Sequence, residues 1–391
     1  MKTLQRLLLM SEWREGSLTE IADIIMGQSP KGEFCSSERD GTPLLNGPTE
    51  FGIKFPTPIQ YTTQVKKVSN INDILFCVRG STTGRMNWAN IEYAIGRGLA
   101  SIRHKHGEEY RYFIKAVLDF NLPILLSSAT GSTFPNVSRS QLEELRILLP
   151  SLEEQKAIAE ILSLLDDKIN LLHHQNKTLE ELAQTVFRQW FIEEAKDNWE
   201  KYKIRDFTTH KKDSIKPAQN PNDEFLHFSL PAFDANKEPN ITIGSDIKSN
   251  KYQVEPFSIL MSKLNPKTPR VWDIYFEPKE NSICSTEFQV VQPNDKSLFP
   301  FISTLLKSDK VTGELSMSAS GTSGSHQRVK PEDIFNISFV TPSIDKMKEF
   351  SELLEPNYLK QIKNQNQIQT LENMRDTLLP KLMSGEIRIN I

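Results

Sequence analysis

The fold is decided by residues 151–191, which read SLEEQKAIAEILSLLDDKINLLHHQNKTLEELAQTVFRQWF. Apolar side chains recur there at alternating intervals of four and three residues, which is the spacing of a coiled-coil seam. The seam positions are Ile158, Leu162, Leu165, Ile169, Leu172, Asn176, Leu179, Ala183, Val186 and Trp190. Ser151 is the expected N-cap, with acids in the first turn, where the helix dipole favours negative charge. The pattern predicts a helix over Leu152–Glu194, ~65 Å long at 1.5 Å per residue.

This helix belongs to an internal repeat, which should be identified before any local assignment. An offset of 192 carries Val137–Leu182 onto Val329–Met374 without a gap. Identical pairs include Pro150 with Pro342, Ser151 with Ser343, Lys156 with Lys348, Glu160 with Glu352, Leu162 with Leu354, Lys168 with Lys360, and Gln175 with Gln367. At smaller offsets, Arg85 matches Arg270 and Trp13 matches Trp199. The chain therefore reads as two diverged copies of a globule followed by a long helix.

The second helix is less regular than the first. Pro356 and Pro380 predict a start or kink near its beginning and its end. Its seam candidates are Phe350, Leu354, Ile368, Leu371, Leu378 and Leu382, with Asn357, Gln361 and Asn364 at positions that are apolar in the first copy. A buried polar residue in a seam weakens packing but fixes register. We expect Asn176 to serve the same purpose; the alternative is that it faces solvent at a frayed seam.

A helix with a long apolar stripe must pack against something, and its duplicate is the simplest partner. A whole globule lies between the two helices in the sequence, so the chain has enough length to return and lay the second helix antiparallel to the first. We predict an α+β fold with two α/β globules, separated by two long helices that form an antiparallel coiled coil with pseudo-two-fold symmetry. The predicted segments are a first globule at 1–150, a helix at 151–197, a second globule at 198–342 and a second helix at 343–391.

Composition favours a protein of the cell interior. The apolar runs are too short for a membrane span, and the start lacks an export signal, so we expect a cytoplasmic protein without membrane contact. Cys35, Cys77 and Cys284 are scattered and odd in number, as expected for reduced thiols. The net charge is −3, yet the acidic excess lies in 151–198. Each globule is nearly balanced and could gather cations on one face for DNA.

Three blocks resemble one known family. The run QKAIAEILSLLDDKI, at 155–169, resembles the start of the central conserved helix of type I restriction-modification specificity subunits. The run LAQTVFRQWF, at 182–191, resembles the end of that helix, and LLPKLMSGEI, at 378–387, resembles the second conserved helix. Gly385 suits the C-cap of the latter.

The resemblance implies two target-recognition domains, with the antiparallel helix pair acting as a ruler between them. It also implies docking sites for two methyltransferase subunits, to which endonuclease subunits are added in the complete complex. The expected ligand is double-stranded DNA with a bipartite, asymmetric target, and the expected role is non-catalytic.

One loop in each globule, glycine-punctuated in the first, is a candidate for DNA contact. In the first, RGSTTGR at 79–85 follows an apolar strand; its repeat partner, MSKLNPKTPR at 261–270, follows another. Cations and hydroxyls suit phosphates and base edges. Their recurrence at equivalent positions favours DNA contact over a solvated surface hairpin. The candidates are Arg79, Ser81, Thr82, Thr83, Arg85, Ser262, Lys263, Lys267 and Arg270.

Small polar loops before the last strand of each globule form a second candidate set. They open at Gly131 and Gly321, and low bulk would permit close approach to a backbone or a groove. The candidates are Thr133, Asn136, Arg139, Thr322, Ser325, His326, Gln327 and Arg328. A structural turn explains these residues almost as well, and a polar loop role for His326 is favoured over metal ligation.

The sequence carries no catalytic signature. It lacks the Asp/Asn-Pro-Pro-Tyr/Phe motif and cofactor loop of a methyltransferase, the P-loop of an ATPase, metal-ligand spacing and a nucleophile-base pair. We therefore expect no cofactor or metal in this chain and assign S-adenosylmethionine, ATP and magnesium to partner subunits. The adjacent acids Asp166-Asp167 and Glu180-Glu181 are expected on a solvated or methyltransferase-facing flank. The alternatives are an enzyme that modifies DNA alone and a scaffold that ignores DNA.

Overall fold

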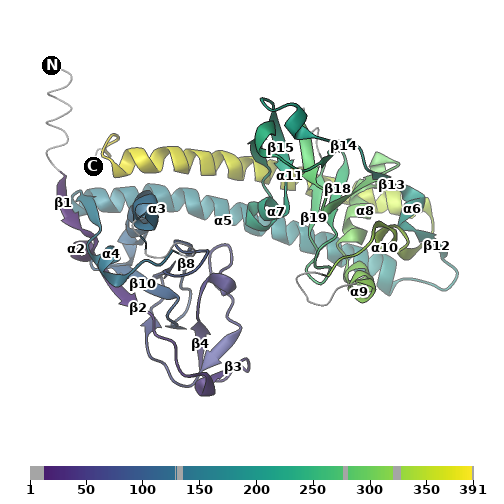
Figure 1. The fold of residues 1–391 in the computed structure, drawn as a ribbon. Coiled ribbons are helices and arrows are strands. Elements are labelled where there is room, and N and C mark those ends of the chain that lie inside the picture. The colour runs from purple at the N-terminus through teal and green to yellow at the C-terminus, as the bar shows by residue number, and fades with distance from the viewer. Residues whose placement is uncertain (1–12, 128, 130–134, 276–280, 320–326, 390–391) are drawn as a thin grey trace. The chain divides into compact units, whose positions relative to one another are not determined.

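The computed structural model describes residues 13–127, 129, 135–275, 281–319 and 327–389 (Figure 1). The chain forms two compact units, Met1–His173 with Asn366–Ile391 and His174–Gln365. Each contains one sheet-bearing globule and parts of two long helices, α5 (Leu152–Arg188) and α11 (Ile344–Met383). The predicted fold class is confirmed, whereas the division into four numbered segments stays a prediction.

The first unit is built around an antiparallel sheet whose strand order is β2-β10-β7-β8. These strands are β2 (Ala22–Met26), β10 (Leu99–His104), β7 (Ile74–Cys77) and β8 (Met86–Trp88). Helix α3 (Arg111–Ser127) contributes Phe113 and Val117 to the same apolar core as Phe76 and Ile102. A second sheet contains β3 (Cys35–Ser36), β5 (Gln60–Thr62), β4 (Thr42–Leu45), β9 (Tyr93–Ile95) and β6 (Val68–Ser69). Strand β1 (Arg14–Ser17) pairs with β11 (Arg146–Leu149), and α2 (Leu18–Ile21) and α4 (Arg139–Glu143) complete the globule.

The second unit repeats the first sheet strand for strand in the order β13-β21-β18-β19. These strands are β13 (Thr208–Lys211), β21 (Phe288–Pro293), β18 (Ser258–Ser262) and β19 (Val271–Ile274). Strand β12 (Glu200–Lys203) pairs with β22 (Ser338–Thr341), as β1 does with β11. The second sheet contains β14 (Ser214–Ile215), β17 (Lys251–Gln253), β20 (Ser282–Ser285), β15 (Glu224–Phe228) and β16 (Asn240–Ile243). The helices are α6 (Ile204–Phe207), α7 (Leu230–Asn236), α8 (Phe299–Leu306), α9 (Asp309–Ser318) and α10 (Pro331–Phe335).

Within each unit, the two long helices pack antiparallel. In the first unit, Leu162 shares a core with Leu382, whereas seven residues further along α5 Ile169 meets Ile368, earlier in α11. In the second unit, Asn176 meets Asn364, and further along α5 the Phe187 and Phe350 rings lie 5.8 Å apart. Sequence positions thus run in opposite directions on the two helices, as predicted. Every predicted seam residue is buried or half-buried.

The helix ends differ slightly from the sequence prediction. Helix α5 ends at Arg188 and continues as one wider π-helical turn, Gln189–Glu193. Helix α11 begins at Ile344, so, of the start or kink predicted at Pro356, the start is not observed. Pro356 is exposed, and its ring can face water while the helix continues on both sides. Gly385 adopts φ +71° just beyond the end of α11, which is the left-handed conformation expected of a glycine C-cap.

The tail after α11 closes onto the first turn of α5 in the first unit. The Arg388 guanidinium donates to both carboxylate oxygens of Glu154, at 2.6 and 2.8 Å. Trp13 Nε1 donates to the same carboxylate at 3.0 Å. The buried Glu154 side chain therefore ties the tail to the start of the first globule. None of the helices in the described ranges has the length and apolar character needed to cross a membrane.

Candidate nucleic-acid interface

The two predicted loops occupy equivalent places in the two units. Residues 78–85, which include the predicted loop, join β7 to β8, and residues 263–270 join β18 to β19. Each loop is closed at its base by the same backbone hydrogen bond, between the last residue of the first strand and the last residue of the loop. These bonds are Cys77 N to Arg85 O at 2.8 Å and Ser262 N to Arg270 O at 2.9 Å. The two loops therefore share one backbone hydrogen-bonding pattern, called the loop frame below, but carry different side chains.

The second candidate segment lies directly beside this loop in both units. Arg79 forms an isolated antiparallel β-bridge with Asn136, and Leu264 forms the equivalent bridge with Arg328. The neighbouring hydrogen bonds are repeated too, from Val137 N to Val78 O and from Val329 N to Lys263 O, both at 3.0 Å. The structure therefore brings together the described members of the two predicted sets within each unit.

In the first unit, several predicted side chains face solvent beside one another. Arg79, Ser81, Thr82 and Arg85 are exposed on the loop, and Asn136 is half-buried in the adjoining segment. Arg139, at the start of α4, pairs with Glu143 at 2.7 Å, and its side chain remains 63% exposed. Exposed ion pairs of this kind contribute little stability. Arg139 can therefore exchange its partner for a phosphate at small cost.

Two predicted contact residues instead hold the loops together. Thr83 is buried, and its hydroxyl lies 2.8 Å from Gly80 O and 2.7 Å from Pro135 O, as a donor. Ser262 is also buried; its hydroxyl donates to Leu264 O and accepts from Leu264 N. Both hydroxyls are used on backbone groups inside the protein. We correct their assignment from DNA contact to support of the loop.

In the second unit, the predicted arginines already have acidic partners. The Arg270 guanidinium binds both carboxylate oxygens of Asp234, at 2.5 and 2.9 Å, and its side chain is 19% exposed. Arg328 donates to Glu287 at 3.1 Å and stays 60% exposed. A bidentate carboxylate fixes the plane of a guanidinium. Arg328 therefore offers more of its surface to a ligand than Arg270 does.

The other predicted residues of the second unit differ in accessibility. Lys267 is exposed, whereas Lys263 and Gln327 are half-buried. Thr133, Thr322, Ser325 and His326 lie outside the described residues.

One cation that the sequence prediction missed lies next to the first loop. Arg97 is exposed in the turn between β9 and β10, and its backbone N donates to Ser29 Oγ at 3.1 Å. The next residue, Gly98, accepts a hydrogen bond from Val78 N at 2.9 Å, immediately before the loop. A Cβ on Gly98 would stand 2.2 Å from Asn46 O, so only glycine fits. The Gly-Arg-Gly triplet could have identified this turn from the sequence.

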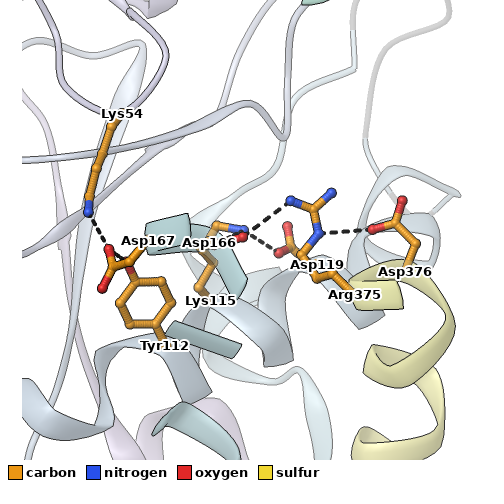
Figure 2. A network of polar contacts seen from close by, with 8 residues as sticks. All are labelled: Lys54, Tyr112, Lys115, Asp119, Asp166, Asp167, Arg375 and Asp376. Carbon is orange, nitrogen blue, oxygen red and sulfur yellow. Dashed lines mark hydrogen bonds and ion pairs between the residues drawn. The ribbon is translucent and has the colours of Figure 1, made fainter. Parts of the chain in front are cut away.

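The paired acids on α5 are not all surface groups, which corrects another expectation. The Asp166 side chain is 13% exposed and lies 3.2 Å from the Arg375 guanidinium of α11 (Figure 2). Glu180 binds Lys307 at 2.9 Å. Asp167, whose side chain is 55% exposed, and Glu181, an exposed partner of Lys177, match the prediction of a solvated flank. Sequence spacing could not identify these partners because they come from distant segments.

The described residues contain no group arranged to hold a metal ion, and two of the three thiols are buried. Across these ranges, no group of three or more His, Cys, Asp or Glu side chains is arranged to hold a metal ion. All three cysteines are free thiols, and Cys77 and Cys284 are buried. Burial raises the pKa of Cys284 to about 12, so its thiol stays protonated near neutral pH.

Comparison with known proteins gives a consistent pattern. Residues 10–181 match a family model described as type I restriction modification DNA specificity domain. The type I restriction enzyme MjaIX specificity subunit of Methanocaldococcus jannaschii is 27% identical over 333 residues, covering 75% of this chain and 72% of that protein. The MjaX specificity subunit of the same organism is 36% identical over 163 residues, which span 42% of this chain and 38% of that relative.

A solved structure shares the fold. The crystal structure of a type I restriction-modification S subunit from M. genitalium aligns over 95% of this chain and 96% of that chain. The TM-score is 0.55 at 17% sequence identity. At this identity the likeness concerns the architecture and leaves the side chains of the loops free to differ.

Proposed function

Because this chain belongs to the family of type I restriction-modification specificity subunits, we propose that each of its globules reads one half of a bipartite DNA target. The observation that carries the proposal is the loop frame built twice, with exposed cations beside hydroxyls and amides. Two equivalent surfaces are what a protein with internal two-fold symmetry presents to two half-sites. Because the side chains have diverged, the two half-sites differ and the target is asymmetric.

The loops combine the two kinds of contact that specific binding requires. Exposed Arg79, Arg85 and Arg97 supply positive charge for phosphates, which position a protein on the duplex. Asparagine side chains, such as that of Asn136, can read the adenine edge in the major groove, and arginine side chains, such as that of Arg328, can read the guanine edge. Thr83 and Ser262 support the loops from inside. Binding by two such surfaces would select a sequence without any chemistry in this chain.

We further propose that two methyltransferase subunits dock on the long helices, followed by endonuclease subunits. Apolar side chains stay exposed there, with Leu164 71%, Leu171 51% and Leu182 48% exposed on α5 and Met374 47% exposed on α11. Leu182 and Met374 occupy equivalent positions of the repeat, so each helix carries a similar exposed group. Exposed apolar stripes are typical of protein interfaces. S-adenosylmethionine, ATP and magnesium would then be bound by the partners, in the cytoplasm.

The test is to sequence the methylome of a methylation-free host that expresses this chain with its methyltransferase subunit. We expect adenine methylation at a split, asymmetric motif, and its loss when this chain is deleted. An unsplit motif, or methylation that persists without this chain, would refute the proposal. Methyl transfer by the purified chain alone would favour an enzyme, and a failure to bind the methylated motif as a duplex would favour a scaffold.

A further inference from the structure

In the first unit, the strand that leaves the recognition loop is tied to the long helix α5 at one carboxylate. Strand β8 follows Arg85, and its last residue, Trp88, packs its ring 5.0 Å from that of Tyr112 on α3. The Tyr112 hydroxyl donates to Asp167 at 3.3 Å. Trp88 N also donates to Lys54 O at 3.0 Å, and Lys54 Nζ donates to Asp167 at 2.8 Å. Figure 2 shows Lys54 and Tyr112 converging on Asp167.

The neighbouring carboxylate, Asp166, adds contacts to the second long helix. The contacts made by Asp166 and Asp167 are together called the joint of the first unit. Asp166 lies 3.9 Å from Lys115 of α3 and 3.2 Å from Arg375 of α11. Lys115 also binds Asp119 at 2.7 Å. Although burial disfavours its charge, the carboxylates of Asp119 and Asp166 raise the pKa of Lys115, which keeps it charged. Helices α3, α5 and α11 are therefore held together by charged groups with little exposure to water.

The second unit has a joint at the same place, made from different chemistry. Strand β19 follows Arg270, and Asp273 takes the position of Trp88, since Ile259 pairs with Asp273 as Ile74 pairs with Trp88. Lys307, which follows α8, bridges Asp273 at 2.6 Å and Glu180 of α5 at 2.9 Å. The Lys307 side chain is 14% exposed and that of Asp273 is 16% exposed. Lys307 lowers the pKa of Glu180 to about 2.

The recurrence of the joint indicates a role beyond stability. The Asp167 and Glu180 side chains are 55% and 36% exposed, whereas those of Asp166, Lys307 and Asp273 are 13–16% exposed. Ion pairs of either kind are weak support for stability, because solvent screening or desolvation offsets much of their attraction, but their geometry is directional. Both joints link the strand that carries the recognition loop to a long helix of the same unit. A strand that could pivot on the helix would present its loop to DNA at a variable position. A strand held at charged, directional contacts would present it at one position.

We propose that Asp167 in the first unit and Lys307 in the second are positioning residues that set the number of base pairs accepted between the half-sites. The inference rests on the proposed function and assigns to these joints the spacing component of target recognition. Neither residue contacts DNA in this account. Each acts by holding the strand behind a recognition loop.

The test uses the methylome of the host that expresses this chain with its methyltransferase subunit. A genome contains the two half-sites at many separations, so methylation can be scored at the native spacer and at spacers one base pair shorter or longer. The variants are Lys307→Met, which removes the bridging charge, and Tyr112→Phe, which removes one donor to Asp167 and keeps the ring beside Trp88. The matched control is Lys177→Met, because Lys177 on α5 forms an exposed ion pair with Glu181 at 3.7 Å.

We expect the ratio of methylation at altered spacers to methylation at the native spacer to rise at least fivefold in Lys307→Met, less in Tyr112→Phe, and not in Lys177→Met. A purely structural role would lower methylation at all spacers together and leave the ratio unchanged, and that result overturns the inference. Ser303→Ala removes only a hydroxyl that donates to Asp273 at 2.6 Å. If Lys307→Met does not fold, this milder variant tests the same joint of the second unit. Absence of any split motif with the unaltered chain would instead refute the proposed function.

Discussion

The side-chain amide of Asn364 donates to Oδ1 of Asn176 at 2.8 Å, across the seam between α11 and α5 in the second unit. Asn364 is fully buried, and its amide nitrogen also lies 3.4 Å from Gln175 Oε1. A shift of one helix past the other would leave this amide buried without an acceptor, which costs more than the hydrogen bond contributes. The pair therefore favours one register of the helices, and the solvated alternative for Asn176 is not observed.

Replacement of one amide should destabilise the second unit more than replacement of both. We expect Asn176→Leu or Asn364→Leu alone to lower the free energy of unfolding by about 1–3 kcal/mol. Asn176→Leu leaves the buried Asn364 amide only the longer contact with Gln175, and Asn364→Leu removes the donor to the half-buried Asn176. The double variant should recover at least about 1 kcal/mol of the summed loss, because two leucines pack across the seam. Urea denaturation of the four proteins measures this coupling. Strictly additive losses would show that the two amides act independently.

The exposed arginines of the first loop should govern the salt dependence of DNA binding. Arg79→Ala and Arg85→Ala should each weaken binding and reduce the slope of log K against log salt by about 1 if the side chain contacts a phosphate. The measurement is fluorescence anisotropy over a salt series, with the duplex motif found by methylome sequencing. Arg188→Ala is the control, as an exposed arginine near the end of α5. An unchanged slope with relaxed sequence preference would indicate a base contact instead.

Periodic features of this molecule were predictable, and contacts between distant segments were not. The 4-3 spacing predicted α5, and the repeat predicted the antiparallel helices and the equivalence of Arg85 with Arg270. Those inferences need only one sequence and regular geometry. The burial of Thr83 depends on Pro135, which lies 52 residues away. The sequence prediction for Asp166 failed for the same reason, because its partner Arg375 lies 209 residues away.

Two of the three hydroxyls of the first loop, those of Thr83 and Ser81, should separate stability from binding. Thr83→Val removes the buried donor to Gly80 O and Pro135 O, and we expect a loss of about 1–2 kcal/mol in unfolding free energy, with weaker DNA binding as a consequence. Ser81→Ala changes an exposed hydroxyl of the same loop, so it should leave unfolding within about 0.5 kcal/mol and alter only DNA binding. Thermal denaturation and anisotropy on both variants test this. Equal thermal stability of Thr83→Val and the unaltered chain would contradict the supporting role of Thr83.

A half-buried histidine in the second unit should make stability depend on pH. His227 lies in β15, and its Nε2 atom is buried without a hydrogen-bond partner among the described residues. Burial, with a smaller contribution from Lys251, lowers the pKa of His227 to about 4. Between pH 6.5 and 4 the unfolded chain therefore binds more protons than the folded one at this position. The stability associated with the neutral ring is complete above pH 6.5 and is lost as the pH falls through this window.

Removal of this ring should flatten the pH dependence of unfolding. Relative to the unaltered chain, we expect His227→Gln to lose about 1–2 kcal/mol less unfolding free energy between pH 7 and pH 5. Urea denaturation at the two pH values measures the difference. The contributions of the other histidines to the pH dependence cancel, because both proteins contain them. His174→Gln, which removes an exposed histidine from α5, is the control and should follow the unaltered chain. If His227→Gln follows it as well, the ring is not held neutral by burial, and the acid sensitivity of the second unit has another source.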